Sequence, residues 1–437
     1  MIRFEILITT HIATQTISLV KETTMKFTKT LIAASLVLVS ADSFAAAFQL
    51  SEQNASGLGR AYAGEASIAD DASVVARNPA LMSLFKEKQI SVAGIAVLPD
   101  VSLKGEGAPA GVPASALNDD SIAPNAIVPA GYFTMPVNDK VSVGFGAFSN
   151  FGLATEFSDD YAAGSLGGET EIVTVNMNVS ASYKVNEQFS VGLGLNAIYA
   201  DAKIIRNVGA NPYQIPAQTQ AVHLEGDDYG FGWNIGAMYQ LDENSRFGFN
   251  YRSETDITFE GEFSSQLPPT LGGTNGVSIP GSVEITLPAI AEFSGSHQLD
   301  DKMGLHYSVM WTGWSSFDKL EAEVGAPTPA FTKEENFSDS MRYAIGGDYQ
   351  LNEDLLLRAG VAFDESPADK NHMSISIPDT DRFWFSFGGN YAIDQHSDFD
   401  LGVSVLRGKT QNFTEDGFSF ESKGHALLVG AQYNYTF

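Results

Sequence analysis

The chain has 437 residues, 53 acidic against 25 basic side chains, 41 glycines and no cysteine. Its net charge of -28 repels phosphate backbones, and no Lys/Arg-rich run reverses the sign locally, so nucleic acid is not expected as a partner. The absence of cysteine excludes disulfide scaffolds, thiol catalysis and cysteine-ligated metal centres.

The N-terminal segment has the features of a secretory signal peptide. Two lysines precede the apolar run Leu31 to Val39, and Ser43-Phe44-Ala45 forms a small-x-small cleavage site. The apolar run is too short for a transmembrane helix. We predict that residues 1–45 are leader and signal peptide, with Met25 as the true start and residues 1–24 as an upstream extension. A genuine long leader is the alternative.

Apolar and polar residues alternate with a period of two through most of the chain after residue 88. The pattern is clearest in residues 173–183, 189–199 and 231–239. The polar positions hold mainly Gly, Ser, Thr and Asn, as expected inside a barrel, whereas a sheet facing solvent would carry many Lys and Glu. The pattern therefore favours a transmembrane β-barrel over the alternative, a soluble secreted β protein.

Short turns rich in Asn and Asp recur at intervals of roughly 45 to 55 residues, long enough for two strands and a long loop. The six turns are Asn138-Asp139-Lys140, Asn186-Glu187-Gln188, Asp242-Glu243-Asn244, Asp300-Asp301-Lys302, Asn352-Glu353-Asp354 and Asp394 to Asp398. Each turn joins two strands, and a first strand near Gln89 to Leu98 and a last strand ending at Phe437 bring the number to 14. We predict an all-β fold, a 14-stranded antiparallel transmembrane β-barrel over residues 89–437.

The segment between the signal peptide and the first strand does not alternate. Residues 46–88 are rich in small side chains, and we expect them to form a compact, partly helical segment. A barrel of about this many strands encloses a lumen that is either open or plugged. We predict that residues 46–88 form a small N-terminal hatch inside the lumen.

Several blocks of sequence resemble the FadL family of outer-membrane long-chain fatty acid transporters, and together they cover essentially the whole mature chain. The blocks are Phe48-Gln49-Leu50, Ser56 to Tyr62, Ile68 to Ala72, Arg77 to Leu81, Asn150 to Phe157, Tyr229 to Asn234, Tyr251 to Glu254 and Ser374 to Trp384. The resemblance implies a monomeric barrel in the outer membrane of a Gram-negative cell, through which fatty acids diffuse down a gradient. The substrate would enter a tight internal pocket and leave sideways where the third strand kinks inward.

Two basic residues match family positions that bind the substrate carboxylate. They are Arg206, at the outer end of the fifth strand, and Lys333, just before the tenth. Apolar walls would supply the affinity for the tail, and buried cations would fix the head group. Without the resemblance, each residue reads as an ordinary solvated cation near a loop.

Three further positions acquire roles through the resemblance. The kink is expected at Ser149-Asn150-Phe151-Gly152, where Gly152 would supply backbone freedom, or would otherwise be a loop glycine at the strand end. Asn78-Pro79-Ala80 resembles the hatch signature, in which the Asn amide could bond the strand wall; the alternative is an ordinary turn. Phe48 matches a residue that reaches the inner pocket, and is otherwise an apolar anchor of the hatch.

No motif supports catalysis or metal binding. The seven histidines show neither HExxH nor an i, i+4 pair, and Gly-x-Ser-x-Gly is missing. An outer-membrane lipase would need a Ser and His pair on the wall, for which His297 and His306 are the candidates. We expect no enzymatic activity, no metal and no cofactor.

The predicted function is import of long-chain fatty acids by passive diffusion through an internal pocket and a lateral opening. The expected partners are long-chain fatty acids or other hydrophobic small molecules, and outer-membrane lipids. An importer of neutral hydrophobic compounds such as aromatic hydrocarbons is the alternative within this fold. A general porin would have little use for a hatch and a lateral exit.

Overall fold

A computed structural model describes residues 47–325, 329–369 and 371–437. The predicted leader and signal peptide, including Met25, lie outside the described residues. The chain divides into the unit Met1–Ser40, which also lies outside them, and the unit Ala41–Phe437, to which the fold below belongs. None of the helices in the described ranges combines the length and apolar character needed to cross a membrane.

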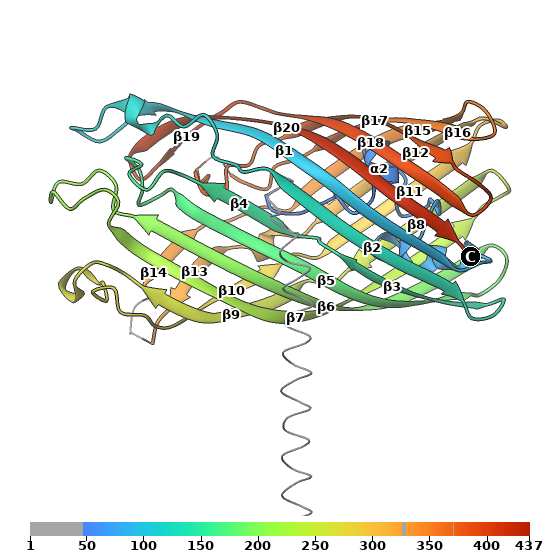
Figure 1. Ribbon diagram of the computed structural model, residues 1–437, viewed down its shortest axis with the longest axis horizontal. Helices are drawn as coiled ribbons and strands as arrows, with labels where there is room; N and C mark the ends of the chain where they lie inside the picture. The colour runs from blue at the N-terminus through green and yellow to red at the C-terminus, as the bar shows by residue number, and fades with distance from the viewer. Residues whose placement is uncertain (1–46, 326–328, 370) are drawn as a thin grey trace, which may run out of the picture. The chain divides into compact units, whose positions relative to one another are not determined.

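Within the described residues, twenty strand segments form one antiparallel sheet that closes on itself where β1 pairs with β20 (Figure 1). Eight wall strands are continuous: β1 (Gln89–Gly107), β2 (Ala126–Pro136), β5 (Gly168–Lys184), β6 (Phe189–Asn207), β7 (Gln220–Gln240), β16 (Leu355–Asp364), β17 (Arg382–Ala392) and β20 (Phe418–Thr436). The other six are each interrupted once: β3 (Val141–Phe148) with β4 (Gly152–Glu156), β8 (Ser245–Arg252) with β9 (Thr255–Ser264), β10 (Ile279–Leu287) with β11 (Ile290–Gln298), β12 (Met303–Thr312) with β13 (Lys319–Glu323), β14 (Phe331–Glu334) with β15 (Ser340–Gln350), and β18 (Ser397–Gly408) with β19 (Gln411–Glu415). The predicted barrel of 14 strands is thereby confirmed.

The first strand is longer than the expected Gln89 to Leu98. Pro99 and Asp100 interrupt its apolar alternation, which resumes at the buried Val101 and Leu103. They do not end its pairing, because β20 supplies a partner from Gln89 as far as Gly107. The expected end of this strand was therefore wrong. Its outer part is held by backbone hydrogen bonds to β20 and by the buried Val101 and Leu103, which belong to the apolar cluster inside the barrel.

The six turns owe their Asn or Asp to a local hydrogen bond. The Asn138 side chain accepts from the backbone amides of Lys140 and Val141 at 2.9 and 3.0 Å. The same bond closes the turns that begin at Asn186, Asp242, Asp300, Asn352 and Asp394. Because a short polar side chain can replace a backbone acceptor, these residues fix the tight turns at one end of the barrel.

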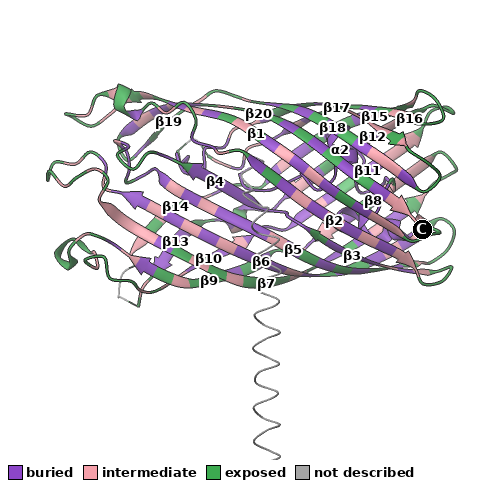
Figure 2. Ribbon diagram, viewed as in Figure 1, coloured by how far each residue is buried: buried purple, intermediate pink, exposed green. Residues whose placement is uncertain are grey.

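Buried and exposed residues alternate along the strands, so that the wall has an inward and an outward face (Figure 2). Large apolar side chains such as Val179, Leu195 and Phe231 are 54%, 64% and 75% exposed, whereas the Asn and Ser side chains between them are buried. In this part of the wall an apolar exterior surrounds a polar interior, which is the pattern of a barrel that spans a bilayer. In the outer part of the barrel the inward face is instead apolar, as at Ile257 and Phe259.

The hatch segment lies inside this wall. It contains α2 (Ala55–Leu58), α3 (Val74–Arg77) and the 3-10 helix η1 (Pro79–Leu84), and nearly all of its residues up to Met82 are buried. Glycines on the wall let its backbone approach closely, since a Cβ on Gly360 would lie 2.1 Å from the Arg60 carbonyl oxygen. Three other short 3-10 helices lie in loops or strand breaks: η2 (Ala114–Leu117), η3 (Pro269–Leu271) and η4 (Trp314–Ser316).

Candidate functional site

Arg206 lies on the inward face at the outer end of β6 and is 4% exposed. Its guanidinium donates to the carbonyls of Glu169 and Ile205 at 3.0 and 2.7 Å, and to the hydroxyls of Thr170 and Ser376, both at 2.9 Å. All of these acceptors are neutral. Among the described residues no carboxylate lies within ion-pair distance of this buried cation, so its charge is solvated by the protein but not neutralised in direct contact.

Lys333 lies on β14 and forms an ion pair with Glu415 of β19. The other oxygen of Glu415 accepts from the backbone amide of Ile375 at 2.9 Å. The Arg206 guanidinium lies 5.9 Å from the ring centroid of Phe331, which is two residues before Lys333 on the same strand. The two predicted cations therefore border one site, although they come from different parts of the chain.

A second carboxylate at this site was missed in the sequence. Glu335, directly after β14, is 1% exposed, and neither of its carboxylate oxygens has a hydrogen-bond partner. The charged groups that act on it are Lys333, Glu415 and Arg206. A period-two reading of residues 331–335 would have placed Glu335 on the same face as Lys333, and this was the signal that could have found it.

An apolar cluster fills the lumen next to the cations. Five aromatic rings form its centre, with centroid separations of 4.6 to 6.4 Å: Phe48, Phe151, Trp314, Phe317 and Phe337. Phe48 belongs to the hatch and Phe151 to the predicted kink, and both are buried. The structure thus joins two predicted positions in one aromatic wall.

The third wall strand breaks at the predicted position, between β3 and β4. The carbonyl of Asn150 accepts from the Leu50 amide at 2.7 Å, and the Gly152 amide donates to the Phe48 carbonyl at 2.8 Å. The Ser149 hydroxyl donates to the Thr174 carbonyl at 2.5 Å. The broken backbone is therefore satisfied by the hatch and by β5. The backbone at Gly152 does not take a positive φ, so the expected glycine freedom is not what permits the break.

The break leaves part of the wall unpaired. β2 pairs with β3 only from Gly131 to Pro136, and β4 pairs with β5 from Gly152 to Glu156. In the described part of the chain no pairing joins β4 to β2. The backbone of β2 from Ala126 to Ala130 therefore has a partner on its β1 side alone.

Asn78, Pro79 and Ala80 fasten the hatch to the wall. The fully buried Asn78 amide donates to the carbonyls of Ala66 and of Ala237 on β7, at 2.6 and 3.0 Å, and its oxygen accepts from the Ala80 amide at 3.0 Å. Pro79 begins η1, where its missing amide hydrogen costs no bond.

Charged residues form a second attachment of the hatch, which the sequence did not indicate. Arg60 pairs with Asp70 at 2.7 Å and with Asp348 of β15 at 3.3 Å, and Arg358 of β16 pairs with Asp70 at 3.1 Å. Partial desolvation raises the pKa of Asp70, but the guanidinium groups of Arg60 and Arg358 outweigh it, so that this pKa falls below its ordinary value. These ion pairs connect the hatch to the wall of the barrel.

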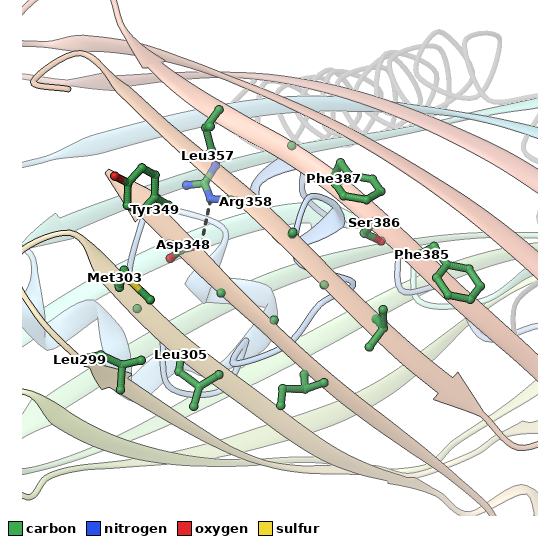
Figure 3. Close-up of a pocket in the computed structure, with 18 residues that line it drawn as sticks. Leu299, Met303, Leu305, Asp348, Tyr349, Leu357, Arg358, Phe385, Ser386 and Phe387 are labelled. Carbon is green, nitrogen blue, oxygen red and sulfur yellow. Dashed lines mark ion pairs between the residues drawn. The ribbon is translucent and has the colours of Figure 1, made fainter. Parts of the chain in front are cut away.

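Figure 3 shows the wall around this network from the outside, with Asp348 and Arg358 paired at 3.8 Å. A hollow of about 830 Å³ lies in this part of the wall, rimmed by apolar side chains including Leu305, Phe385 and Phe387. These three side chains point away from the lumen. The hollow therefore faces the lipid and is separate from the luminal cluster.

His306 lies in a hydrogen-bonded chain with a serine and an aspartate. Its Nδ1 is 2.9 Å from the Ser296 hydroxyl, and its Nε2 is 2.9 Å from Asp348. His306 also lines a polar hollow of about 330 Å³ between the hatch and the wall. Asp348 is shared with Arg60, so this chain is continuous with the ionic attachment of the hatch. His297 instead contacts Ser245 and Tyr307.

Comparisons with known proteins agree with this geometry. The family model of outer membrane protein transport proteins (OMPP1/FadL/TodX) matches residues 36–437. The long-chain fatty acid transport protein of Salmonella typhi is 41% identical over 433 residues, which cover 94% of this chain and 99% of that protein.

Solved structures share the fold. A Pseudomonas aeruginosa FadL homologue has a TM-score of 0.80 at 22% identity, covering 90% of this chain and 100% of its own. The P. putida toluene transporter TodX has a TM-score of 0.66 at 16% identity, covering 88% and 99%. From the family match and the relative at 41% identity, the chain belongs to the OMPP1/FadL/TodX family of outer membrane transport proteins.

Proposed function

We propose that this outer-membrane barrel imports long-chain fatty acids by passive diffusion. The observation that carries the proposal is the position of Arg206 and Lys333, two basic residues at the edge of a buried apolar cluster inside the barrel. A cation beside an apolar lumen matches a molecule with one anionic end and a long hydrocarbon tail. The name of the relative at 41% identity supports the same substrate class.

The head group would bind where Arg206 and Lys333 meet. Arg206 already makes bonds to neutral acceptors, which an anionic carboxylate can replace with stronger charge-assisted ones. Lys333 would exchange Glu415 for the substrate or share it. The tail would lie among the aromatic rings around Phe48 and Phe151, gaining ~0.8 kcal/mol for each buried methylene.

The substrate would leave through the wall at the broken third strand. At the unpaired edge of β2 opposite β4 no backbone ladder has to be broken for the wall to open. Phe151 lies at this break and belongs to the luminal aromatic cluster, so the apolar path leads directly to the gap. The fatty acid would then enter the bilayer sideways rather than cross the hatch.

The alternative is import of neutral hydrophobic compounds, which the name of the toluene transporter suggests for that protein. A neutral hydrocarbon gains nothing from cations beside its pocket, and burying Arg206 is costly. Arg206 and Lys333 therefore favour an acid as the substrate. We further propose that the protein is a monomer surrounded by outer-membrane lipids and is secreted with a cleaved signal peptide.

We propose that the barrel carries out no chemistry on its substrate. In the chain Ser296, His306 and Asp348, the aspartate is already engaged by Arg60. The serine lies on a strand rather than on a nucleophile elbow. The hydrogen bonds among Ser296, His306 and Asp348 are therefore explained as support for the ionic attachment of the hatch.

The proposed function is tested by uptake of a radiolabelled long-chain fatty acid into cells that lack their own importer. We expect rescue by the wild type, and a raised half-saturation concentration for the double variant Arg206→Ala/Lys333→Ala. Lys319→Ala is the matched control, because this lysine pairs with the partly exposed Glu321 of its own strand. Rescue that is insensitive to the double variant would favour a neutral substrate, and absence of rescue would contradict the transport proposal.

A further inference from the structure

The cation site contains as many carboxylates as cations. Glu415 pairs with Lys333, and Glu335 lies beside both Lys333 and Arg206 without a hydrogen bond to either. The formal charge of the four side chains is therefore balanced before any substrate arrives. A site built only to attract an anion would not need two buried acids.

Glu335 is in an unusual state for a buried carboxylate. It is 1% exposed, and both of its oxygens lack a donor among the described residues. The nearby donors are engaged, because Arg206 bonds four neutral acceptors and Lys333 pairs with Glu415. Asp318, on the neighbouring segment, contributes only its backbone carbonyl, which accepts from the Glu335 amide at 2.8 Å. A buried carboxylate without donors favours its protonated form or a ligand that brings a proton.

An incoming carboxylate would make the balanced site negative. Two carboxylates that share a buried site cannot both remain ionised at low cost, but they can share one proton in a short hydrogen bond. The shared proton restores the charge balance and gives Glu335 the donor that it lacks. Arg206 and Lys333 would exchange some of their present acceptors for the outer oxygens of the pair.

We propose that Glu335 is a head-group residue that binds the fatty acid carboxyl through a shared proton, and that it selects carboxylic acids over anions that cannot hold a proton. This inference rests on the proposed function, since it assigns a role within the same site. The fatty acid anion and Glu335 bind together with one proton between them: this proton comes from solvent where Glu335 starts ionised, and it is the proton of Glu335 itself where Glu335 starts protonated. No covalent bond is formed or broken.

The selectivity follows from the acidity of the ligand. A carboxylic acid has nearly the same proton affinity as Glu335, so the proton can be shared. A sulfonate of equal chain length has the same charge and tail but is far too acidic to hold the proton. Its binding would have to protonate Glu335 alone, without a second group to share the proton.

The experiment is titration calorimetry of the purified full-length barrel with palmitate and with hexadecanesulfonate, in buffers of different ionisation enthalpy between pH 7 and 9. For the wild type we expect the proton uptake on palmitate binding to increase from pH 7 towards one proton at pH 9, because a growing fraction of Glu335 starts ionised and the shared proton then comes from solvent. At the alkaline end of this range the palmitate Kd then rises by up to about ten-fold for each unit of pH. We expect Glu335→Gln to bind palmitate with no proton uptake and to bind sulfonate on the order of ten-fold more tightly than the wild type.

Glu334→Gln is the matched control, because Glu334 is the preceding residue and is exposed. It should retain the proton uptake and the preference of the wild type. Proton uptake that is absent in the wild type, or unchanged in Glu335→Gln, would overturn the assignment of Glu335. Failure of the proposed function is a different result, in which the wild type binds no palmitate at all.

Discussion

The amide of Gly152, at the break in the third wall strand, donates a hydrogen bond of 2.8 Å to the carbonyl of Phe48, near the start of the hatch. A second bond, from Leu50 to Asn150, completes a short antiparallel contact. The hatch thus supplies the backbone hydrogen-bond partner that β2 does not supply to the broken third strand. Hatch position and wall opening are linked by backbone hydrogen bonds.

Phe48→Ala is predicted to loosen this contact. The ring is fully buried, and its centroid lies 4.6 Å from that of Trp314 and 5.1 Å from that of Phe317. Its loss therefore leaves a cavity that lowers the free energy of unfolding by about 3 to 5 kcal/mol. We expect faster hydrogen exchange in residues 47–54 and a higher half-saturation for fatty acid uptake. Phe145→Ala is the control, because this ring on β3 is 50% exposed on the lipid side. Equal exchange in both variants would contradict the prediction.

Gly236→Ala is predicted to displace the hatch from β7. A Cβ at this position would lie 1.9 Å from the Asn78 side-chain oxygen, so that Asn78 must move and lose its bond to Ala237. Overpacking of this kind costs about 1 to 3 kcal/mol. We expect faster hydrogen exchange in residues 78–82. Gly131→Ala on β2 is the control, since its Cβ would meet nothing within 4 Å, and it should exchange like the wild type.

Much of the barrel could be predicted because its determinants are local. The alternation of residues 173–183 and the Asn or Asp at each turn depend on neighbours within a few positions, and both were visible in the sequence. The hatch was recognised by the failure of that same alternation. Arg206 and Lys333 came from a family resemblance, since an isolated cation carries no local signal of its own.

The remaining features depend on contacts between distant parts of the chain. Lys333 and Glu415 are 82 positions apart, and Arg60 and Asp348 are 288 apart. No local sequence pattern indicates ion pairs between such distant residues. The expectation that Gly152 permits the break through its backbone freedom was wrong for the same reason. Hatch backbone that is distant in the sequence stabilises the break, and Gly152 has no special conformation. The end of the first strand was misjudged because β20 determines it.

Glu52 makes the packing of the hatch dependent on pH. This hatch residue is 1% exposed, and neither carboxylate oxygen has a hydrogen-bond partner among the described residues. Burial raises its pKa from 4.5 to about 7, and the opposing effects of its own backbone and of Arg382 and Arg342 do not cancel the burial.

Because the packed state holds the proton more tightly, its advantage is complete below pH 4.5 and is lost as pH rises through about 7. The difference corresponds to roughly 3 kcal/mol. We therefore predict that the hatch is less protected at pH 8.5 than at pH 5.5. The measurement is hydrogen exchange of residues 47–60, taken at each pH as the ratio of the wild type to Glu52→Gln, which cancels the intrinsic pH dependence of exchange.

The wild type should exchange faster than Glu52→Gln at pH 8.5, and the two should converge at pH 5.5, where the carboxyl is neutral like the amide. Glu87→Gln, at the exposed end of the hatch segment, should match the wild type at both values. A ratio that does not change with pH would mean that the Glu52 carboxylate stays charged in the packed hatch. Arg382 and Arg342 would then outweigh the effect of burial on this group.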